Sequence, residues 1–437
     1  MVHTAVVLAA GEGMRLRPLT RNRPKPMLPA ANRPILEYVL DALVESGAER
    51  VVIVVGYKHD RVQNHFGPRY RDVPLTYVRQ DKQLGSGHAL LQARDYVEDA
   101  MLVVNGDCLI DSGIVEDVCD AFDAGEGEPT LAVLENQNTK QYGAVTLRDG
   151  FVEEIIEKPT TDEYRLINAG IYAFDDSIFA AIDDTPRQEG ELALTDTIAR
   201  EIAAGRVRGV ETSGLWVDAT YPWDLLTVGN EVLSHGLTDE PERESGVWVD
   251  ETAIVHETAT LQPPVVVGPD CEVGPGAVVG PTTALGRNVT VGANTTVERS
   301  VLDADTRVRP GSTLLDTVTG QDVYLGPNTV VSGAPADVRV GTSIFEDERL
   351  GAVIADRARA DGAVHGFHPG SAGRPRAAHL HTGTAVDGHV GERTEVASLM
   401  CGIIGAVGRG SDTLDVLVHG RLETGVSGLR LGGRALS

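Results

Sequence analysis

The sequence has little cysteine, lysine or aromatic side chain and no long apolar run, and each shortage narrows what the protein can be. Its 437 residues include four cysteines, five lysines and 5% aromatic residues. The cysteines lie far apart without a CxxC pair, which argues against a disulfide framework and for reduced thiols in a cytoplasmic protein. No apolar stretch approaches the roughly 20 residues that cross a bilayer, and the start lacks the basic region of a signal peptide. We therefore expect a cytoplasmic protein with no membrane partner.

Positive charge is also scarce. The chain carries 64 acidic and 38 basic residues, which gives a formal net charge of -26. Such a surface repels nucleic acid and anionic lipid, so neither is an expected partner. Because lysine is so rare and carboxylates are so common, the composition also suggests a halophilic protein that works in a salt-rich cytosol.

The first half of the chain alternates expected strands and helices. Apolar runs at 4–10, 50–56 and 100–107 predict buried strands, while 33–47 and 88–97 have helical spacing. Repeated strand–helix units with continuous apolar strands predict an α/β, Rossmann-like domain with a mixed, mostly parallel sheet covered on both faces. Ligands of such sheets bind beyond the carboxyl ends of the strands, and a glycine-rich loop follows the first strand.

The pattern changes after about residue 235. Residues 236–246 are polar and predict a linker, and 247–362 carry an aliphatic residue at nearly every sixth position. These residues are Val249, Val255, Leu261, Val267, Val273, Val279, Leu285, Val291 and Val297, followed with slips by Leu302, Val308, Leu314, Leu325 and Val331. Hexapeptide repeats of this kind predict a left-handed parallel β-helix in which each coil stacks on the next. Residues 363–399 form an irregular tail with weak repeats.

The loop after the first strand gathers five cations in a short segment of this acidic chain. They are Arg15, Arg17, Arg21, Arg23 and Lys25. Backbone N–H groups of a glycine-rich loop can approach phosphates closely, and a triphosphate needs several converging positive donors. We therefore expect these cations to serve a polyanion.

This segment, "LAAGEGMRLRPLT…PKPMLP", resembles the signature of sugar-1-phosphate nucleotidylyltransferases. Further motifs of that family follow in order: "QLGSGHA", "NGDCL", "YGAV", "IIEKP", "LINAGIY" and "LWVDATYPWDLL". The resemblance covers residues 1–235 as the nucleotidyltransferase domain. It is nearest to the bifunctional type that joins N-acetylglucosamine-1-phosphate uridylyl transfer to glucosamine-1-phosphate acetyl transfer, in its archaeal form.

The resemblance implies a reaction and a set of site residues. The oxygen of a sugar-1-phosphate attacks the α-phosphorus of a nucleoside triphosphate in line, and pyrophosphate leaves. Arg15, Lys25 and Asp107 would be catalytic, and Asp107 with Asp218 would bind Mg²⁺ as the cofactor. The nucleotide would contact Leu8, Ala9, Ala10, Gly11, Gly13, Gln80, Gly85 and Ser86. The sugar would contact Tyr142, Gly143, Glu157, Lys158 and Asn168.

Several alternatives stay open at the level of sequence. "LAAG" and "QLGSGHA" favour UTP and N-acetylglucosamine-1-phosphate, whereas "EKP" and "VDATYPWDLL" are similar to thymidylyltransferases and would allow TTP or glucose-1-phosphate. Acetylation of glucosamine-1-phosphate by the solenoid is another alternative, but its repeats contain only one histidine, His256, as a general base. We expect it to hold a homo-oligomer, a trimer or larger, together. A non-catalytic regulatory homologue is a further alternative, although Arg15 and Lys25 are both present.

The last segment belongs to neither domain. "MCGIIGAVG", Met400 to Gly408, resembles the start of the glutamine-dependent amidotransferase that makes glucosamine-6-phosphate. In that family the N-terminal cysteine is the nucleophile and its own amine activates it, whereas the nitrogen of Cys401 is a peptide amide. We therefore expect 400–437 to be non-functional and hypothesise a frameshift or read-through into a neighbouring gene.

Overall fold

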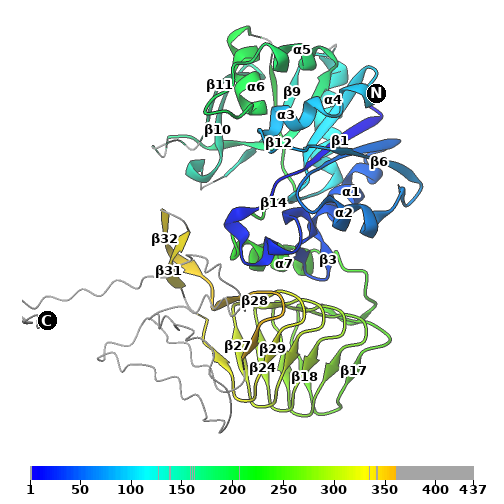
Figure 1. The fold of residues 1–437 in the computed structure, drawn as a ribbon, viewed down its shortest axis with the longest axis vertical. Helices are drawn as coiled ribbons and strands as arrows, with labels where there is room; N and C mark the ends of the chain where they lie inside the picture. The colour runs from blue at the N-terminus through cyan, green and yellow to red at the C-terminus, as the bar shows by residue number, and fades with distance from the viewer. Residues whose placement is uncertain are drawn as a thin grey trace, which may run out of the picture.

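The computed structural model describes residues 2–360, apart from positions 126, 137, 138, 158, 160, 162, 206, 334, 341 and 342. The irregular tail and the amidotransferase-like segment therefore lie outside the described residues. The described chain forms an N-terminal domain that ends with a helix at Ser234 and a solenoid whose first strand begins at Glu242, which Figure 1 shows stacked one above the other; the predicted linker 236–246 thus already contains a strand of the solenoid.

The N-terminal domain is built on one ten-stranded sheet. Across the sheet the order is β10 (Gly143–Arg148), β11 (Phe151–Glu157), β13 (Arg208–Glu211), β9 (Thr130–Glu135), β12 (Leu166–Asp175), β7 (Ala100–Asn105), β1 (Thr4–Ala9), β4 (Arg50–Val55), β6 (Val73–Arg79) and β5 (Arg69–Tyr70). The pairings make β5, β11 and β12 run opposite to the other seven strands. The predicted mixed, mostly parallel α/β sheet is confirmed.

Helices cover both faces of this sheet because its strands are apolar on both sides. The helices are α1 (Ile35–Glu45), α2 (His59–Phe66), α3 (Ser86–Leu91), α4 (Ser112–Ala124), α5 (Ser177–Asp183), α6 (Leu194–Ala203) and α7 (Asp224–Ser234). Along β1 and β4, Val7 and Ile53 belong to the core under α1 and α4, while Val6 and Val52 belong to the core under α3, α5 and α6. Alternate side chains of a strand point to opposite faces, so a doubly covered strand must be apolar throughout.

The solenoid consists of three parallel sheets. The first contains β15 (Glu242–Glu244), β16 (Val247–Val249), β19 (Val265–Val267), β22 (Thr283–Leu285), β25 (Val301–Leu302), β28 (Thr317–Thr319) and β33 (Ala352–Ile354); within it, β15 pairs antiparallel to β16. The second contains β17 (Ile254–Val255), β20 (Glu272–Val273), β23 (Thr290–Val291), β26 (Arg307–Val308), β29 (Tyr324–Leu325) and β34 (Arg359–Ala360). The third contains β18 (Thr260–Leu261), β21 (Val278–Val279), β24 (Thr296–Glu298), β27 (Thr313–Leu315) and β30 (Val330–Val331).

The repeat length of the sequence sets the coil length. Val247 pairs with Val265, which is 18 residues or three hexapeptides later, whereas Thr290 pairs with Arg307, 17 residues later. The one-residue slip in the aliphatic repeat is thus absorbed as a shorter coil. The repeat residues Val267 through Leu314 are fully or almost fully buried inside the solenoid. The predicted parallel β-helix is therefore confirmed.

The two domains share an apolar core. Leu225, Val228 and Val232 of α7 pack with Val266, Ala284 and Val318 of the solenoid. Figure 1 shows α7 lying between the sheet of the N-terminal domain and the coils. The solenoid therefore acts as a packing partner of the N-terminal domain and is more than an attached tail.

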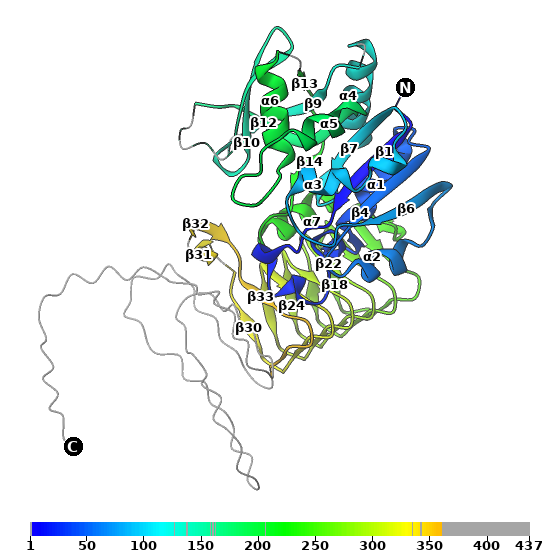
Figure 2. The ribbon, with the colours of Figure 1, turned by 45° about the horizontal axis from the view of Figure 1, so that its top comes forward.

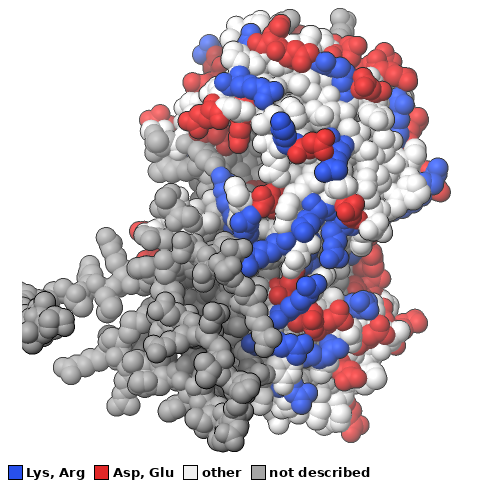
Figure 3. All heavy atoms as spheres, viewed as in Figure 1, with Lys and Arg blue, Asp and Glu red and all other residues white. Residues whose placement is uncertain are grey.

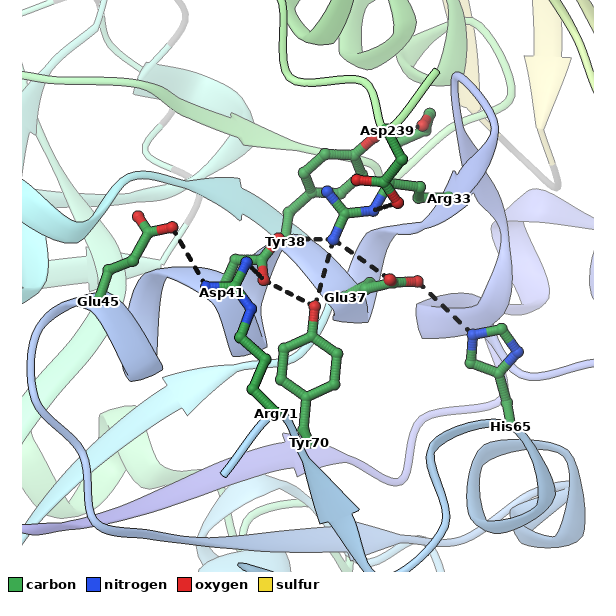
Figure 4. Close-up of polar contacts among 10 residues, drawn as sticks. Arg33, Glu37, Tyr38, Asp41, Glu45, His65, Tyr70, Arg71 and Asp239 are labelled. Carbon is green, nitrogen blue, oxygen red and sulfur yellow. Dashed lines mark hydrogen bonds and ion pairs between the residues drawn. The ribbon is translucent and has the colours of Figure 1, made fainter. Parts of the chain in front are cut away.

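An arginine near the start of α1 adds polar contacts at the junction (Figure 4). Arg33 lies in β3 (Arg33–Pro34), which pairs with β2 (Pro29–Ala30). Its guanidinium contacts Asp41 at 2.5 Å, Glu37 at 3.2 Å and Asp239 at 3.2 Å, and its Cζ lies 4.7 Å from the ring centre of Tyr38. Because Asp239 belongs to the segment between the domains, these contacts tie that segment to the first helix.

The charges are unevenly distributed over the surface. On the face shown in Figure 3, acidic side chains occupy both domains, while lysine and arginine side chains gather across the junction between them. A cleft of about 750 Å³ at this junction is lined by Arg23, Arg61, Arg307 and Arg357, together with three aspartates and other polar residues.

Among the described helices, none is both long and apolar enough to cross a membrane.

Candidate active site

Pairing of two short strands brings two carboxylates together. β8 (Cys108–Ile110) begins just after β7, and β14 (Trp216–Asp218) pairs with it antiparallel so that Asp218 lies opposite Cys108. Asp107 therefore lies beside Asp218 although the two are far apart in the sequence. Both lie beyond the carboxyl end of β7, at the sheet edge where the strand–helix pattern predicts a ligand.

Lys25 lies between these carboxylates. Its Nζ is 2.6 Å from Oδ2 of Asp107 and 3.2 Å from Oδ1 of Asp218, and its side chain is 12% exposed. Burial by itself would lower the pKa of Lys25, but the negative charges of Asp107 and Asp218 outweigh burial and raise it. The ammonium group therefore stays charged, and the three groups form one electrostatic unit.

The glycine-rich loop packs directly against Lys25. Gly13 has φ 68°, and a Cβ there would lie 2.9 Å from Cβ of Lys25. The hydroxyl of Thr20 donates to the carbonyl oxygen of Gly13 at 2.8 Å and fixes the loop. Glycine is required here both by the left-handed backbone and by the close approach to Lys25.

The other residues expected to bind the nucleotide near this loop lie either in β1 or just after it. Leu8 and Ala9 belong to β1, with Ala9 packed in the core, whereas Ala10 and Gly11 follow the strand. Arg15 is exposed, and its Cζ lies 5.9 Å from the centre of the Tyr221 ring. Of these side chains, that of Arg15 is the exposed one.

The expectation that all five cations of the segment serve a polyanion is wrong for Arg23, which is buried and pairs with Asp303 and Asp356 of the solenoid. Arg17 is partly exposed and forms an ion pair with Glu12, which lies in the same loop. The carboxylates that explain Arg23 are brought near it by tertiary structure alone, and no local feature of the sequence indicated them.

Gln80, Gly85 and Ser86 lie at a second loop. The Nε2 of Gln80 lies 3.1 Å from the carbonyl oxygen of Gly85, to which it donates, and 2.9 Å from Nδ1 of His88. The hydroxyl oxygen of Ser86 accepts a hydrogen bond from the backbone N–H of Leu194 at 2.9 Å. Gly85 has φ 100°, and a Cβ there would lie 2.4 Å from the carbonyl oxygen of Leu192. This loop is thus held by internal contacts before any ligand arrives.

Three of the residues expected to contact the sugar lie together, and a fourth is next to them. Gly143 pairs with Glu157 between β10 and β11, and a Cβ at Gly143 would lie 3.3 Å from Oε2 of Glu157 and 3.8 Å from Cβ of Asn168. Tyr142 precedes Gly143 and packs edge-on against Trp216 of β14, with ring centres 5.3 Å apart. Lys158 lies outside the described residues.

The donor set of the carboxylate pair fits a hard cation. Ligand atoms of Asp107, Cys108 and Asp218 lie within 4.8 Å of one another, the one such group of at least three found in the described part of the chain. Burial raises the pKa of the Cys108 thiol well above its usual value, with the carboxylates adding to the effect. A neutral thiol is a poor ligand for Mg²⁺, whereas carboxylate oxygens are the ligands that it prefers. The residues expected to bind Mg²⁺, Asp107 and Asp218, are thus suited to it.

The sequence interpretation missed an aromatic cluster formed by Tyr221, Trp223 and Phe345. The rings of Tyr221 and Trp223 are stacked with centres 4.7 Å apart, and Phe345 of the solenoid contacts both at 4.5 Å and 5.2 Å. The motif "VDATYPWDLL" displayed the first two aromatic residues, but nothing near Phe345 in the sequence linked it to them.

Comparison with known proteins places this site in a family. Residues 4–235 match the family described as nucleotidyl transferase, and residues 244–336 match the one described as GMPPB C-terminal domain. A Methanococcus maripaludis protein named bifunctional protein GlmU is 33% identical over 383 residues, which cover 84% of this chain and 90% of that protein. A protein of the same name from Methanocaldococcus jannaschii is 34% identical over 381 residues, with the same coverage of both chains. The UTP--glucose-1-phosphate uridylyltransferase AglF of Haloferax volcanii is 35% identical over 224 residues, which cover 50% of this chain and 92% of that protein.

The chain belongs to the nucleotidyl transferase family. It is an enzyme of the sugar-1-phosphate nucleotidylyltransferase class, and its similarity to the archaeal GlmU proteins extends over both the N-terminal domain and the solenoid. The family resemblance predicted from the sequence motifs is thereby confirmed.

Proposed function

We propose that the enzyme transfers a uridylyl group from UTP to N-acetylglucosamine-1-phosphate, which gives a UDP-sugar and pyrophosphate. The observation that carries the nucleotidyl transfer is the contact of the Lys25 ammonium group with both Asp107 and Asp218, beside the glycine-rich loop. The choice of UTP is supported by the named activity of the Haloferax relative. The choice of sugar is supported by "QLGSGHA" and by the similarity to the GlmU proteins.

In the proposed reaction the chain acts by positioning and by neutralising charge. Lys25 leaves the carboxylates and contacts the α-phosphate, and Arg15 moves toward the β- and γ-phosphates, where negative charge grows on the departing pyrophosphate. The backbone N–H groups of Ala10, Gly11 and Gly13 line the path of the triphosphate. No covalent enzyme intermediate is needed, because the attacking oxygen belongs to the sugar phosphate.

Asp107 and Asp218 would hold Mg²⁺. When bound, the ion would supply positive charge next to the reacting phosphates and help to align them. Both carboxylates contact the Lys25 ammonium group in the structure, so the residues that would hold the metal also position the lysine.

Base and sugar are assigned to the two sides of the site. The amide of Gln80, with Gly85 and Ser86, would recognise the edge of a pyrimidine, because an amide offers both a donor and an acceptor. Glu157 and Asn168 would bond the sugar hydroxyl groups, with Tyr142, Gly143 and Lys158 completing that side. The solenoid would hold a homo-oligomer together without transferring acetyl groups; its His256 is exposed, and its Nδ1 lies 2.9 Å from the hydroxyl of Thr258.

The experiment is pyrophosphate release by the full chain with UTP, TTP or GTP against N-acetylglucosamine-1-phosphate and glucose-1-phosphate in Mg²⁺. We expect the UTP and N-acetylglucosamine-1-phosphate pair to have the highest kcat/KM. Lys25→Ala and Asp107→Asn should each lower turnover about 10²–10³-fold, as removal of a preorganised charge does. Lys58→Ala, at an exposed lysine outside the site, is the matched control. Near-normal turnover of Lys25→Ala would refute the assignment, and preference for another substrate pair would refute the specificity.

A further inference from the structure

A hairpin of the solenoid reaches the N-terminal domain close to the candidate active site. It consists of β31 (Pro335–Val340) and β32 (Ser343–Arg349), paired antiparallel and inserted between β30 and β33 of the coils. Figures 1 and 2 show the hairpin projecting from the end of the solenoid toward the part of the N-terminal domain that holds β14 and α7. A hexapeptide solenoid needs no such insertion to stack its coils, so the hairpin calls for a separate explanation.

The two faces of β32 differ in their surroundings. Phe345 packs on the aromatic pair of the N-terminal domain, with its ring centre 4.5 Å from that of Tyr221 and 5.2 Å from that of Trp223. Its neighbour Ile344 is 53% exposed. Val338 of β31 is 3% exposed and belongs to the core shared by the two domains. The hairpin is therefore anchored on the N-terminal domain by one face.

The Tyr221 ring, on which Phe345 packs, lies next to two parts of the candidate active site. Tyr221 follows Asp218 by three residues, and its backbone N–H donates to Oδ2 of Asp224 at 2.6 Å. Besides Trp223 and Phe345, the Tyr221 ring has Arg15 as a neighbour, whose Cζ is 5.9 Å from the ring centre. Tyr221 is thus contacted by Phe345 from the solenoid and by Arg15 from the glycine-rich loop.

We infer that Phe345 is a positioning residue for nucleotidyl transfer. By packing on Tyr221 it fixes the ring against which the Arg15 guanidinium lies, and so it holds Arg15 ready for the leaving phosphates. The solenoid thereby contributes to the chemistry of the N-terminal domain through one side chain. This inference rests on the role proposed above for Arg15.

The test is a double-mutant cycle in the full chain, with kcat and KM measured from pyrophosphate release. Phe345→Leu keeps apolar bulk but removes the ring, and we expect it to lower kcat about tenfold while KM for the sugar phosphate changes less than twofold. Phe345→Tyr should restore most of the rate. Ile344→Leu, on the outward face of the same strand, is the matched control and should leave kcat unchanged.

Arg15→Ala distinguishes positioning from a general loss of structure. If Phe345 acts through Arg15, adding Phe345→Leu to Arg15→Ala should change kcat less than twofold, because residues that act as one unit are not additive. If the two losses multiply, or if Phe345→Leu behaves like Ile344→Leu, the inference is wrong. The cycle can be run with whichever nucleotide and sugar phosphate the enzyme turns over fastest, so a wrong choice of substrate would not be confused with a failure of the inference.

Discussion

Arg23→Ala should weaken the packing between the two domains and lower the free energy of unfolding, because the Arg23 side chain bridges the domains from a buried position. Arg23 is the cation of the glycine-rich segment that contacts the solenoid through Asp303 and, at 3.4 Å, Asp356. The side chains of all three residues are at most 9% exposed. Truncation to alanine removes the positive charge and leaves two almost fully buried carboxylates without their cation.

The expected loss of stability depends on which hydrogen bonds each carboxylate retains in the variant. Asp356 retains two donors, the backbone N–H of Gln321 at 2.9 Å and the amide of Asn22 at 3.0 Å. Asp303 retains the N–H of Ala304 at 2.7 Å on Oδ1, while its Oδ2 is the atom that contacts Arg23. Breaking a buried ion pair by removing one partner costs about 3–5 kcal/mol. Since Asp356 stays bonded, we expect about 3 kcal/mol, most of it from Asp303.

The assay is urea unfolding followed by tryptophan fluorescence, because Trp223 is buried in the core that both domains share. Adding Asp303→Ala to Arg23→Ala should recover about 1–2 kcal/mol, as coupled neighbours do. Arg148→Ala, which breaks a surface pair with Glu153, is the control and should cost less than about 1 kcal/mol. A loss for Arg23→Ala no larger than the control, or strictly additive effects of the two substitutions, would refute the reasoning.

Three further outcomes are expected. Burial raises the pKa of Asp224 to about 7, with the N–H of Tyr221 opposing and Asp218 adding to the shift. The folded chain then holds a proton that the unfolded chain loses above about pH 4, so the free energy of unfolding falls as pH rises toward 7. Asp224→Asn removes this dependence, and its free energy of unfolding in urea titrations should gain about 2–3 kcal/mol relative to the parent between pH 5 and pH 8. Gly13→Ala adds backbone strain of about 1–2 kcal/mol and pushes on Lys25, so turnover should fall, whereas Gly47→Ala, with φ 92° and open space around it, should keep normal turnover; equal rates in the two variants would contradict this. The net charge of -26 predicts a higher melting temperature in 1 M KCl than in dilute buffer, since screening shortens from about 10 Å at 0.1 M to about 3 Å at 1 M, and a flat melting temperature would contradict the halophilic interpretation.

Both architectures could be predicted from the sequence because local periodicity carries them. Continuous apolar runs such as Val51–Val55 are needed wherever helices cover both faces of a sheet, and they show in the sequence without knowledge of any partner. The six-residue repeat predicts the β-helix for the same reason, since each coil repeats one local pattern. Even the slip to Leu302 appears directly as a 17-residue coil.

The candidate site could be predicted only through its motifs. The glycine loop, Lys25 and Asp107 stand in short segments whose residue types point to phosphate and metal chemistry. Their arrangement depends on long-range pairing: Asp218 meets Asp107 because β14 pairs with β8, and Ser86 bonds Leu194 from a distant segment. Such contacts are set by how elements pack, and a single sequence has no local signal for them.

The sequence by itself determined the fold classes, the order of the two domains and the position of the glycine-rich loop, because spacing and residue type encode these within a few residues of one another. Tertiary structure alone decided where the cations of that loop lie: Lys25 contacts Asp107 and Asp218, Arg15 lies beside the Tyr221 ring, and Arg23 pairs with carboxylates of the solenoid. It also decided that Phe345 meets Tyr221 across the domain junction. The physical reason is that charge pairing and ring packing depend on distance in space, and the chain separates these partners by more than a hundred residues.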